Sequence, residues 1–242
     1  MLIAPHNSAV DTLISGNLQQ LRVQVAEAAG AAHRTVESIT VIAVSKGHDA
    51  ASVRAAAAMG ALHFGESYAQ EAIPKRESLR DLKATWHFIG RLQANKTRSI
   101  AESFDWVHGI DRLKIAQRLS AQRPHHAPAL QACLQINIAG ESGKAGVEPE
   151  AAGELARAVA VLPRLRLRGL MCILPADLSS ENNRRHFAAL RRLREQLNAQ
   201  GATLDTLSMG MSADFRDAIL EGATLIRVGT AIFGPRTATS HE

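Results

Sequence analysis

Apolar residues near the N-terminus recur with the spacing of an amphipathic helix. Most of them lie three or four residues apart, which places their side chains on one face of a helix. We expect Gly30 to end this helix, because glycine is common just after a helical C-terminus. The apolar run comprises Val10, Leu13, Ile14, Leu18, Leu21, Val25 and Ala28.

Beyond this helix, short apolar runs alternate with longer stretches rich in alanine and leucine. The short runs contain many β-branched and aromatic residues and predict strands at 39–45, 61–66, 86–90, 105–110, 129–138, 165–174, 203–209 and 224–229. The stretches between them predict helices near 49–59, 67–80, 94–102, 112–122, 148–161, 180–200 and 213–221. Several strands are apolar at nearly every position, as in a sheet that is covered on both faces. The alternation predicts parallel β/α units of about 30 residues each.

The number of units distinguishes two arrangements of a parallel sheet. An open, doubly wound sheet that binds a dinucleotide is disfavoured, because no G-x-G-x-x-G fingerprint follows the first strand. Eight units in 242 residues instead match a closed barrel, which typically needs about 250 residues. No break in composition marks a second domain. We therefore predict an α/β fold, a single (β/α)8 TIM barrel over residues 1–242 with an extra N-terminal helix.

Composition limits the classes of protein that fit this pattern. The chain is 46% hydrophobic and 21% charged, as in soluble globular proteins, and no apolar run approaches the roughly 20 residues that span a bilayer. The first residues lack the basic and apolar segments of a signal peptide, so we expect a cytoplasmic protein without a membrane partner. Cys133 and Cys172 lie in apolar, strand-like runs and are expected to be buried thiols. No metal-ligand spacing occurs, and we predict no metal.

The net charge of +5 and the pI near 9.7 point first towards a nucleic-acid partner. Much of the arginine falls on one predicted helix, however, and such a run is usually a solvated face. No recognised nucleic-acid module accompanies it, so we expect no nucleic-acid binding. The arginines of this helix are Arg184, Arg185, Arg191, Arg192 and Arg194.

Lys46 is the most specific candidate for a functional residue in the chain. Functional side chains of a barrel cluster where strands end and βα loops begin, and Lys46 directly follows the apolar run VIAVS. Desolvation against the core and nearby cations lower the pKa of a lysine there, which gives the neutral amine that adds to carbonyl groups. The alternative interpretation is a surface lysine just past a strand. The other residues at predicted strand ends, most of them polar or glycine, are Glu66, Ser67, Gly90, Arg91, Gln93, Asn95, His108, Gly109, Asp111, Asn137, Met171, Ser208, Ser212, Arg227, Gly229 and Thr230.

The last two strands carry a second signal. Arg227 lies inside an apolar strand that opens into the turn Gly229-Thr230, and the preceding strand ends in the loop Ser208 to Ser212. Backbone N–H groups and hydroxyls at such turns suit a phosphate dianion, which barrels often hold with the loops after strands seven and eight. Together with a lysine after strand one, these loops indicate a phosphorylated carbonyl compound.

Six ordered motifs resemble one known family. The segments AVSK (43–46), HFGESYAQEA (63–72), WHFIGRLQANK (86–96), GLMCILP (169–175), LSMGMSADF (207–215) and IRVGTAIFG (226–234) are similar to the YggS/PROSC family of pyridoxal phosphate homeostasis proteins. The resemblance runs from about residue 10 to 234. It implies a barrel of the alanine racemase N-terminal type, without the second β domain of the racemase. It also implies a protein that binds and buffers pyridoxal 5′-phosphate (PLP), a vitamin B6 cofactor.

The resemblance assigns roles to particular residues. Lys46 matches the lysine that forms the internal aldimine with PLP, and Arg227 matches the arginine that faces the pyridine nitrogen. A guanidinium can only donate, so it keeps that nitrogen unprotonated and weakens the cofactor as an electron sink. The alternative for Arg227 is an ion pair with Glu66 or Asp111 that closes the barrel end. The implied cofactor-binding set is Lys46, Ser67, Asn95, Ser208, Met209, Ser212, Arg227, Gly229 and Thr230, with Ser208, Ser212, Gly229 and Thr230 in the phosphate region.

One position departs from the family pattern. Many relatives are expected to read FGEN, whereas this chain has Phe64-Gly65-Glu66-Ser67. A hydroxyl on a shorter side chain replaces an amide at Ser67. We therefore expect a hydrogen bond near the cofactor to be lost or taken over by water.

The leading hypothesis is a non-catalytic PLP carrier in which no residue is catalytic, with apo PLP enzymes as candidate recipients. The first alternative is a PLP-dependent racemase or decarboxylase. The chain ends soon after the last strand, so we expect it to lack the domain that supplies the racemase's second acid/base and its dimer interface, and to be a monomer. The second alternative is a Schiff-base aldolase without cofactor, in which Glu66 or His108 would serve as the acid/base.

Overall fold

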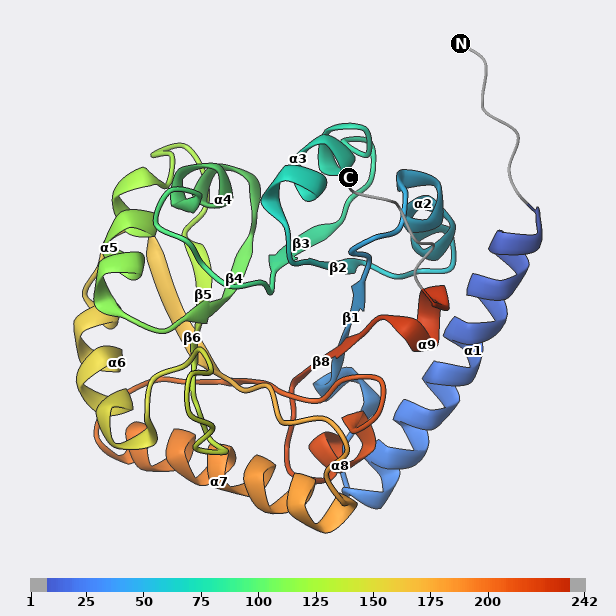
Figure 1. The fold of residues 1–242 in the computed structure, drawn as a ribbon. Coiled ribbons are helices and arrows are strands. Elements are labelled where there is room, and N and C mark those ends of the chain that lie inside the picture. The colour runs from blue at the N-terminus through green and yellow to red at the C-terminus, as the bar shows by residue number, and fades with distance from the viewer. Residues whose placement is uncertain (1–7, 236–242) are drawn as a thin grey trace.

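Eight parallel strands close into one barrel in a computed structural model that describes residues 8–235. Each strand pairs with the next along the chain, and β8 pairs with β1 to complete the ring (Figure 1). The strands are β1 (Thr40–Val44), β2 (His63–Glu66), β3 (Thr85–Phe88), β4 (Trp106–Ile110), β5 (Leu130–Gln135), β6 (Leu165–Met171), β7 (Thr206–Ser208) and β8 (Leu225–Val228). The predicted barrel fold is therefore confirmed.

The helices form an outer layer around this barrel (Figure 1). They are α1 (Ser8–Ala31), α2 (Ala50–Ala58), α3 (Ala69–Glu77), α4 (Thr97–Ser103), α5 (Leu113–Gln122), α6 (Ala152–Ala160), α7 (Ser180–Ala199), α8 (Phe215–Leu220) and α9 (Thr230–Phe233), with short 3-10 turns at Val36–Ser38 and Pro149–Ala151. None of these helices within residues 8–235 has the length and apolar character needed to cross a bilayer.

The extra N-terminal helix α1 packs along α2, α8 and α9 at the side of the barrel where β8 meets β1 (Figure 1). Its apolar face is buried, and Asn17 donates from Nδ2 to the carbonyl oxygen of Ile232 in α9 at 2.9 Å. The expected stop at Gly30 is wrong, because the helix continues to Ala31. His33 instead takes the left-handed conformation that ends the helix, with φ 53°.

Two further sequence predictions need correction. The runs at 129–138 and 165–174 are apolar beyond the ends of their strands, which stop at Gln135 and Met171, because loop residues just past these ends, such as Ile136 and Cys172, are buried as well. The short helix α9 was not predicted, since four residues carry too little periodicity to be recognised. Its first residue, Thr230, lies two residues after the end of β8 and so at the rim where all eight strands end.

Candidate functional site

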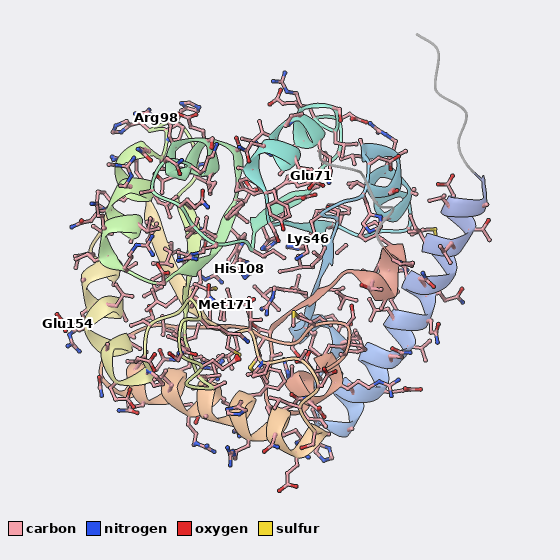
Figure 2. The ribbon with its side chains drawn as sticks, viewed as in Figure 1. Lys46, Glu71, Arg98, His108, Glu154 and Met171 are labelled. Atoms are coloured by element: carbon pink, nitrogen blue, oxygen red, sulfur yellow. The ribbon has the colours of Figure 1, made fainter. Side chains whose placement is uncertain are left out.

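Lys46 lies in the turn that begins two residues after β1. Side chains alternate across a strand, so Ile42 and Val44 share one side of β1, where both lie beside Gly65 of β2. Lys46 is half-buried. Figure 2 shows Lys46, His108 and Met171 near the barrel centre, whereas Arg98 and Glu154 lie on the outer helices. The sequence therefore delivers an amine to the C-terminal mouth of the barrel.

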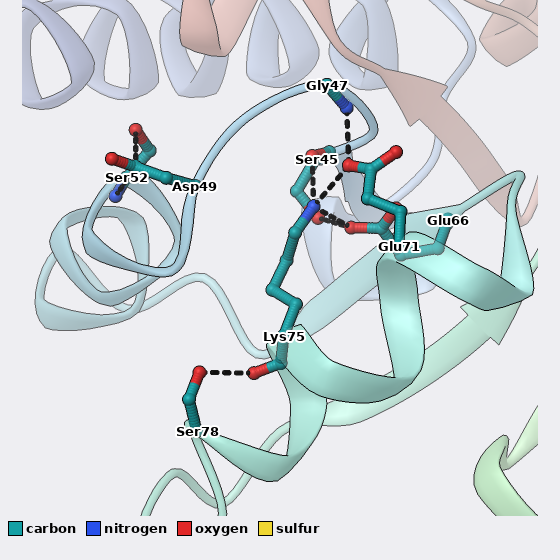
Figure 3. Close-up of polar contacts among 8 residues, drawn as sticks. All are labelled: Ser45, Gly47, Asp49, Ser52, Glu66, Glu71, Lys75 and Ser78. Carbon is teal, nitrogen blue, oxygen red and sulfur yellow. Dashed lines mark hydrogen bonds and ion pairs between the residues drawn. The ribbon is translucent and has the colours of Figure 1, made fainter. Parts of the chain in front are cut away.

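The backbone on both sides of Lys46 is held by a cluster that we call the Lys75 clamp, formed by Ser45, Gly47, Glu66, Glu71 and Lys75, of which Ser45, Glu66 and Lys75 are buried (Figure 3). Lys75 Nζ donates to the Ser45 carbonyl at 2.8 Å, and to Oε1 of both Glu66 and Glu71 at 2.7 Å. Glu71 Oε1 also accepts from the N–H of Gly47 at 2.6 Å, and Ser45 Oγ donates to Glu66 Oε1 at 2.7 Å. The residues before and after Lys46 are thus fixed from behind the barrel wall.

Glu66 is the member of the Lys75 clamp whose burial is energetically unfavourable. Its side chain is completely buried, and burial raises the pKa of its carboxyl, opposed by the neighbouring Lys75 ammonium. Its second oxygen, Oε2, has no hydrogen-bond partner among the described residues. A buried carboxylate needs its cation, so Lys75 is required for the geometry around Lys46.

Arg227 is almost fully buried inside β8. Its Nη1 donates to Ser208 Oγ at 2.7 Å and its Nη2 donates to the Cys172 carbonyl at 2.8 Å. The alternative of an ion pair at the barrel end is wrong, because in the described structure Glu66 pairs with Lys75 and Asp111 pairs with Arg112. A guanidinium carries five N–H donors, so further donors remain for an acceptor in the barrel mouth.

The loop after β7 and the turn after β8 lie together at the same rim. The N–H of Gly229 donates to Ser212 Oγ at 3.4 Å, which joins the two predicted phosphate segments. The α9 helix begins at Thr230, where the first N–H groups of a helix have no partner within the helix. His48, two residues after Lys46, stacks on Phe233 of α9 with ring centroids 5.0 Å apart, so the Lys46 turn packs against this segment.

The remaining predicted residues differ in how they present their side chains. Ser67 is half-buried, and its carbonyl oxygen lies so close to Gly90 that a Cβ there would meet it at 2.2 Å. Met209 is completely buried in the hydrophobic core, so its side chain is withdrawn from the mouth. Asn95 is exposed in the turn before α4. Neither Ser67 nor Asn95 takes part in the described hydrogen bonds of Arg227 or of the Lys75 clamp beside Lys46.

His108 does not lie at the mouth, contrary to expectation. It is in the middle of β4, completely buried, and its pKa is lowered to about 3 by burial and then by Arg227. Glu66 lies in the Lys75 clamp, behind the wall. The aldolase alternative therefore loses both of its proposed acid/base groups.

Both cysteines are free and buried, as predicted, and burial raises the pKa of each thiol to about 12. The arginine-rich helix α7 is partly neutralised, because Arg184 and Arg191 both pair with Glu221. Within residues 8–235 no group of three or more His, Cys, Asp or Glu side chains is arranged to hold a metal ion.

The donor set fits a phosphorylated heteroaromatic aldehyde. The Lys46 amine at the mouth can react with a carbonyl carbon. The buried Arg227 guanidinium, which only donates hydrogen bonds, can bind an unprotonated ring nitrogen. The hydroxyls of Ser212 and Thr230, with the N–H groups at the start of α9, suit a phosphate dianion. These three kinds of donor lie on β1, β8 and the loops after β7 and β8, which are neighbours in the barrel.

Comparisons with known proteins point to the same chemistry. The family model described as "Alanine racemase, N-terminal domain" matches residues 16–237. The chain is 53% identical over 223 residues to the pyridoxal phosphate homeostasis protein of Pseudomonas aeruginosa, covering 92% of this chain and 96% of that protein. It is 47% identical over 229 residues to the protein of that name in Escherichia coli K12, covering 92% and 97%. PipY of Synechococcus elongatus, solved with PLP bound, superposes with a TM-score of 0.81 at 39% identity, covering 91% of this chain and 100% of that chain.

Proposed function

The chain belongs to the family of pyridoxal phosphate homeostasis proteins, and we propose that it binds and buffers PLP, held covalently by the Lys46 amine. One observation carries the proposal. The turn with Lys46 packs through His48 against the α9 segment that begins at Thr230, and this segment is joined to Ser212. An amine and a phosphate-binding segment are therefore neighbours at the barrel mouth, as a phosphorylated aldehyde requires.

Each part of the site has its own task in this proposal. PLP supplies an electrophilic aldehyde on an electron-withdrawing ring. The Lys75 clamp fixes the backbone around Lys46 and so orients its amine. Arg227 donates towards the ring nitrogen, while Ser212 and the Gly229-Thr230 turn hold the phosphate. Ser208 accepts a hydrogen bond from the Arg227 guanidinium and so helps to position it.

We propose that the bound cofactor is stored and delivered without turnover. Because Arg227 cannot protonate the ring nitrogen, the cofactor is a weak electron sink. A racemase also needs a second acid/base opposite the lysine. Tyr68 is 58% exposed at the start of α3, and Cys133 and Cys172 are buried with raised pKa values, so none of the three is suited to that role.

The same proposal covers partners and compartment. Apo PLP enzymes are the candidate recipients, and a monomer remains the expected state, which light scattering tests. The two free thiols fit a reducing compartment such as the cytoplasm.

An absorption titration tests the proposal. We expect PLP to produce a visible band that saturates with the wild-type protein, and that is absent from Lys46→Ala. Lys83→Ala is the matched control, because Lys83 is exposed and lies two residues before the start of β3, at the end of the barrel opposite the mouth. Wild-type protein that gives no band with PLP would overturn the proposal.

A further inference from the structure

A row of hydrogen-bonded side chains crosses the barrel interior from β2 to β8. His63 Nδ1 lies 2.9 Å from His87 Nε2, and His87 Nδ1 lies 3.0 Å from His108 Nε2. His108 Nδ1 in turn lies 2.8 Å from Ser208 Oγ, which accepts from Arg227 Nη1 at 2.7 Å. The row connects Arg227 to His63, the first residue of β2 and thus at the opposite end of that strand from the mouth.

Arg227 fixes the direction of this row. A guanidinium can only donate, so Ser208 Oγ is its acceptor and keeps its own hydrogen for another partner. The other described partner of Ser208 Oγ is His108 Nδ1, which therefore accepts. A neutral imidazole has one donor and one acceptor nitrogen, so His108 donates from Nε2 to His87, and His87 donates from Nε2 to His63. All the donors point away from Arg227.

The reverse order is less favourable. It would make His108 Nδ1 a donor to Ser208, so that Ser208 Oγ accepted two hydrogen bonds. The Ser208 hydroxyl hydrogen would then lack an acceptor among the described contacts, inside a completely buried side chain. A buried donor without a partner is disfavoured.

Burial keeps the row neutral, as the direction requires. His87 and His108 are completely buried, and burial is the largest cause that lowers the pKa of each. Trp106 stacks on the His87 ring with centroids 5.5 Å apart, and the Arg168 guanidinium lies over Trp106 at 5.2 Å. Arg168 is itself paired with Asp205. The stack of Arg168, Trp106 and His87 therefore fixes the plane of the His87 ring in addition to its hydrogen bonds.

We propose that Ser208, His108 and His87 are positioning residues for Arg227, joined in a one-way hydrogen-bond relay that ends at His63. The relay occupies the Ser208 hydroxyl hydrogen and so presents the oxygen lone pair to the guanidinium. It also transmits a change in hydrogen bonding at Arg227 to the far end of β2. The proposal deepens the PLP site and rests on the proposed function for the role of Arg227, but the direction of the relay exists without the cofactor.

The first test is a long-range ¹H–¹⁵N correlation spectrum of full-length protein without PLP, with ¹⁵N-labelled histidine. We expect His63, His87 and His108 to be neutral and protonated on Nε2, with each signal assigned by a single histidine-to-glutamine substitution. A His108 protonated on Nδ1, or a charged His108 at neutral pH, would overturn the relay.

Serine variants separate the relay from simple packing. Ser208→Ala removes the donor to His108, and we expect the ratio of its two tautomers to shift by about fivefold, the factor that one hydrogen bond is worth. Ser208→Thr keeps a hydroxyl and should restore the wild-type ratio. Ser120→Ala removes another buried serine hydroxyl, which donates to Pro163 outside the barrel, and should leave the ratio unchanged. An unchanged ratio in Ser208→Ala would contradict the proposal.

Adding PLP to the labelled protein distinguishes the relay from the proposed function. We expect the His63 Nε2 signal to shift on binding, to keep that shift in His87→Gln, and to lose it in His87→Leu. Glutamine keeps one donor and one acceptor, whereas leucine has neither. PLP binding without any His63 response would overturn the relay alone. A failure to bind PLP would overturn the proposed function and leave the tautomers of the cofactor-free protein as predicted.

Discussion

Lys75 Nζ lies 2.7 Å from Glu66 Oε1, and this buried ion pair stands behind the strand that delivers Lys46. Removing the cation leaves a buried carboxylate without a partner. Lys75→Met should therefore lower the free energy of unfolding by about 3–5 kcal/mol, measured by urea denaturation. Lys83→Met removes an exposed lysine and should change it by less than about 0.5 kcal/mol. Equal effects of the two variants would contradict the role given to Lys75.

The pH dependence of Lys75→Met gives a second check on the same pair. Burial raises the pKa of Glu66 and Lys75 lowers it, so the variant should raise this pKa further. When a carboxyl has a raised folded-state pKa, the folded protein holds a proton that the unfolded chain has released, and stability falls as pH rises towards that pKa. We expect the loss of stability in Lys75→Met to be smaller at about pH 5 than at about pH 8. A loss that does not change with pH would argue against Glu66 as its source.

Gly90 marks the close approach of the loops after β2 and β3. A Cβ at Gly90 would lie 2.2 Å from the Ser67 carbonyl oxygen, so Gly90→Ala must displace backbone at the mouth. We expect it to lower the free energy of unfolding by about 1–3 kcal/mol and to weaken PLP binding. Gly30→Ala is the control, because Gly30 lies in α1 with nothing within 4 Å of a new Cβ. Gly30→Ala should stabilise the protein by up to about 1 kcal/mol. A larger loss of stability in Gly30→Ala than in Gly90→Ala would refute this packing argument.

The phosphate segments provide a test of ligand recognition. Ser212→Ala combined with Thr230→Ala removes two donors to a dianion, each worth about 1.5–3 kcal/mol, so PLP affinity should fall at least about tenfold. Pyridoxal, which lacks the phosphate, should bind the wild-type protein correspondingly poorly. Thr203→Ala removes an exposed hydroxyl before β7, at the other end of the barrel, and should leave affinity unchanged. Equal affinities for pyridoxal and PLP would rule out the phosphate site.

The non-catalytic proposal predicts an absence of turnover. PLP-loaded protein incubated with L-alanine, L-serine and other amino acids should give no enantiomer exchange, keto acid or amine above the rate of free PLP. The reason is the donor-only Arg227 and the lack of a suited acid/base in Tyr68, Cys133 or Cys172. Turnover at about 1–1000 per second that disappears in Lys46→Ala would instead establish an enzyme.

The sequence predicts the barrel well because its main signal is repeated. Eight apolar runs separated by helical stretches identify β/α units even where single boundaries are wrong, as at the end of the 129–138 run. The position of Lys46 at the mouth can also be predicted from the sequence, because this lysine directly follows an apolar strand. The mouth as a whole is predictable because parallel strands end at one rim.

The Lys75 clamp and the histidine row were not predictable in the same way. Lys75 is a polar residue on a predicted helix, and only the packing of α3 against β1 and β2 reveals that it meets Glu66. His63, His87 and His108 come from three strands, and their alignment depends on the stagger of the barrel. The alternation of side chains along β2, β3 and β4 was the available signal, but sequence alone does not give the register between strands.

Borohydride reduction of the PLP-loaded protein, followed by peptide mapping, tests the covalent assignment most directly. Reduction makes the link between lysine and cofactor permanent, so the labelled peptide identifies the residue. We predict a single label on Lys46, and no label in Lys46→Ala that keeps its fold. Lys75 is the most informative alternative, because it lies next to the Lys46 turn but is engaged by Glu66, Glu71 and the Ser45 carbonyl. A label on Lys75, Lys96 or another lysine in the wild-type protein would contradict the site described above.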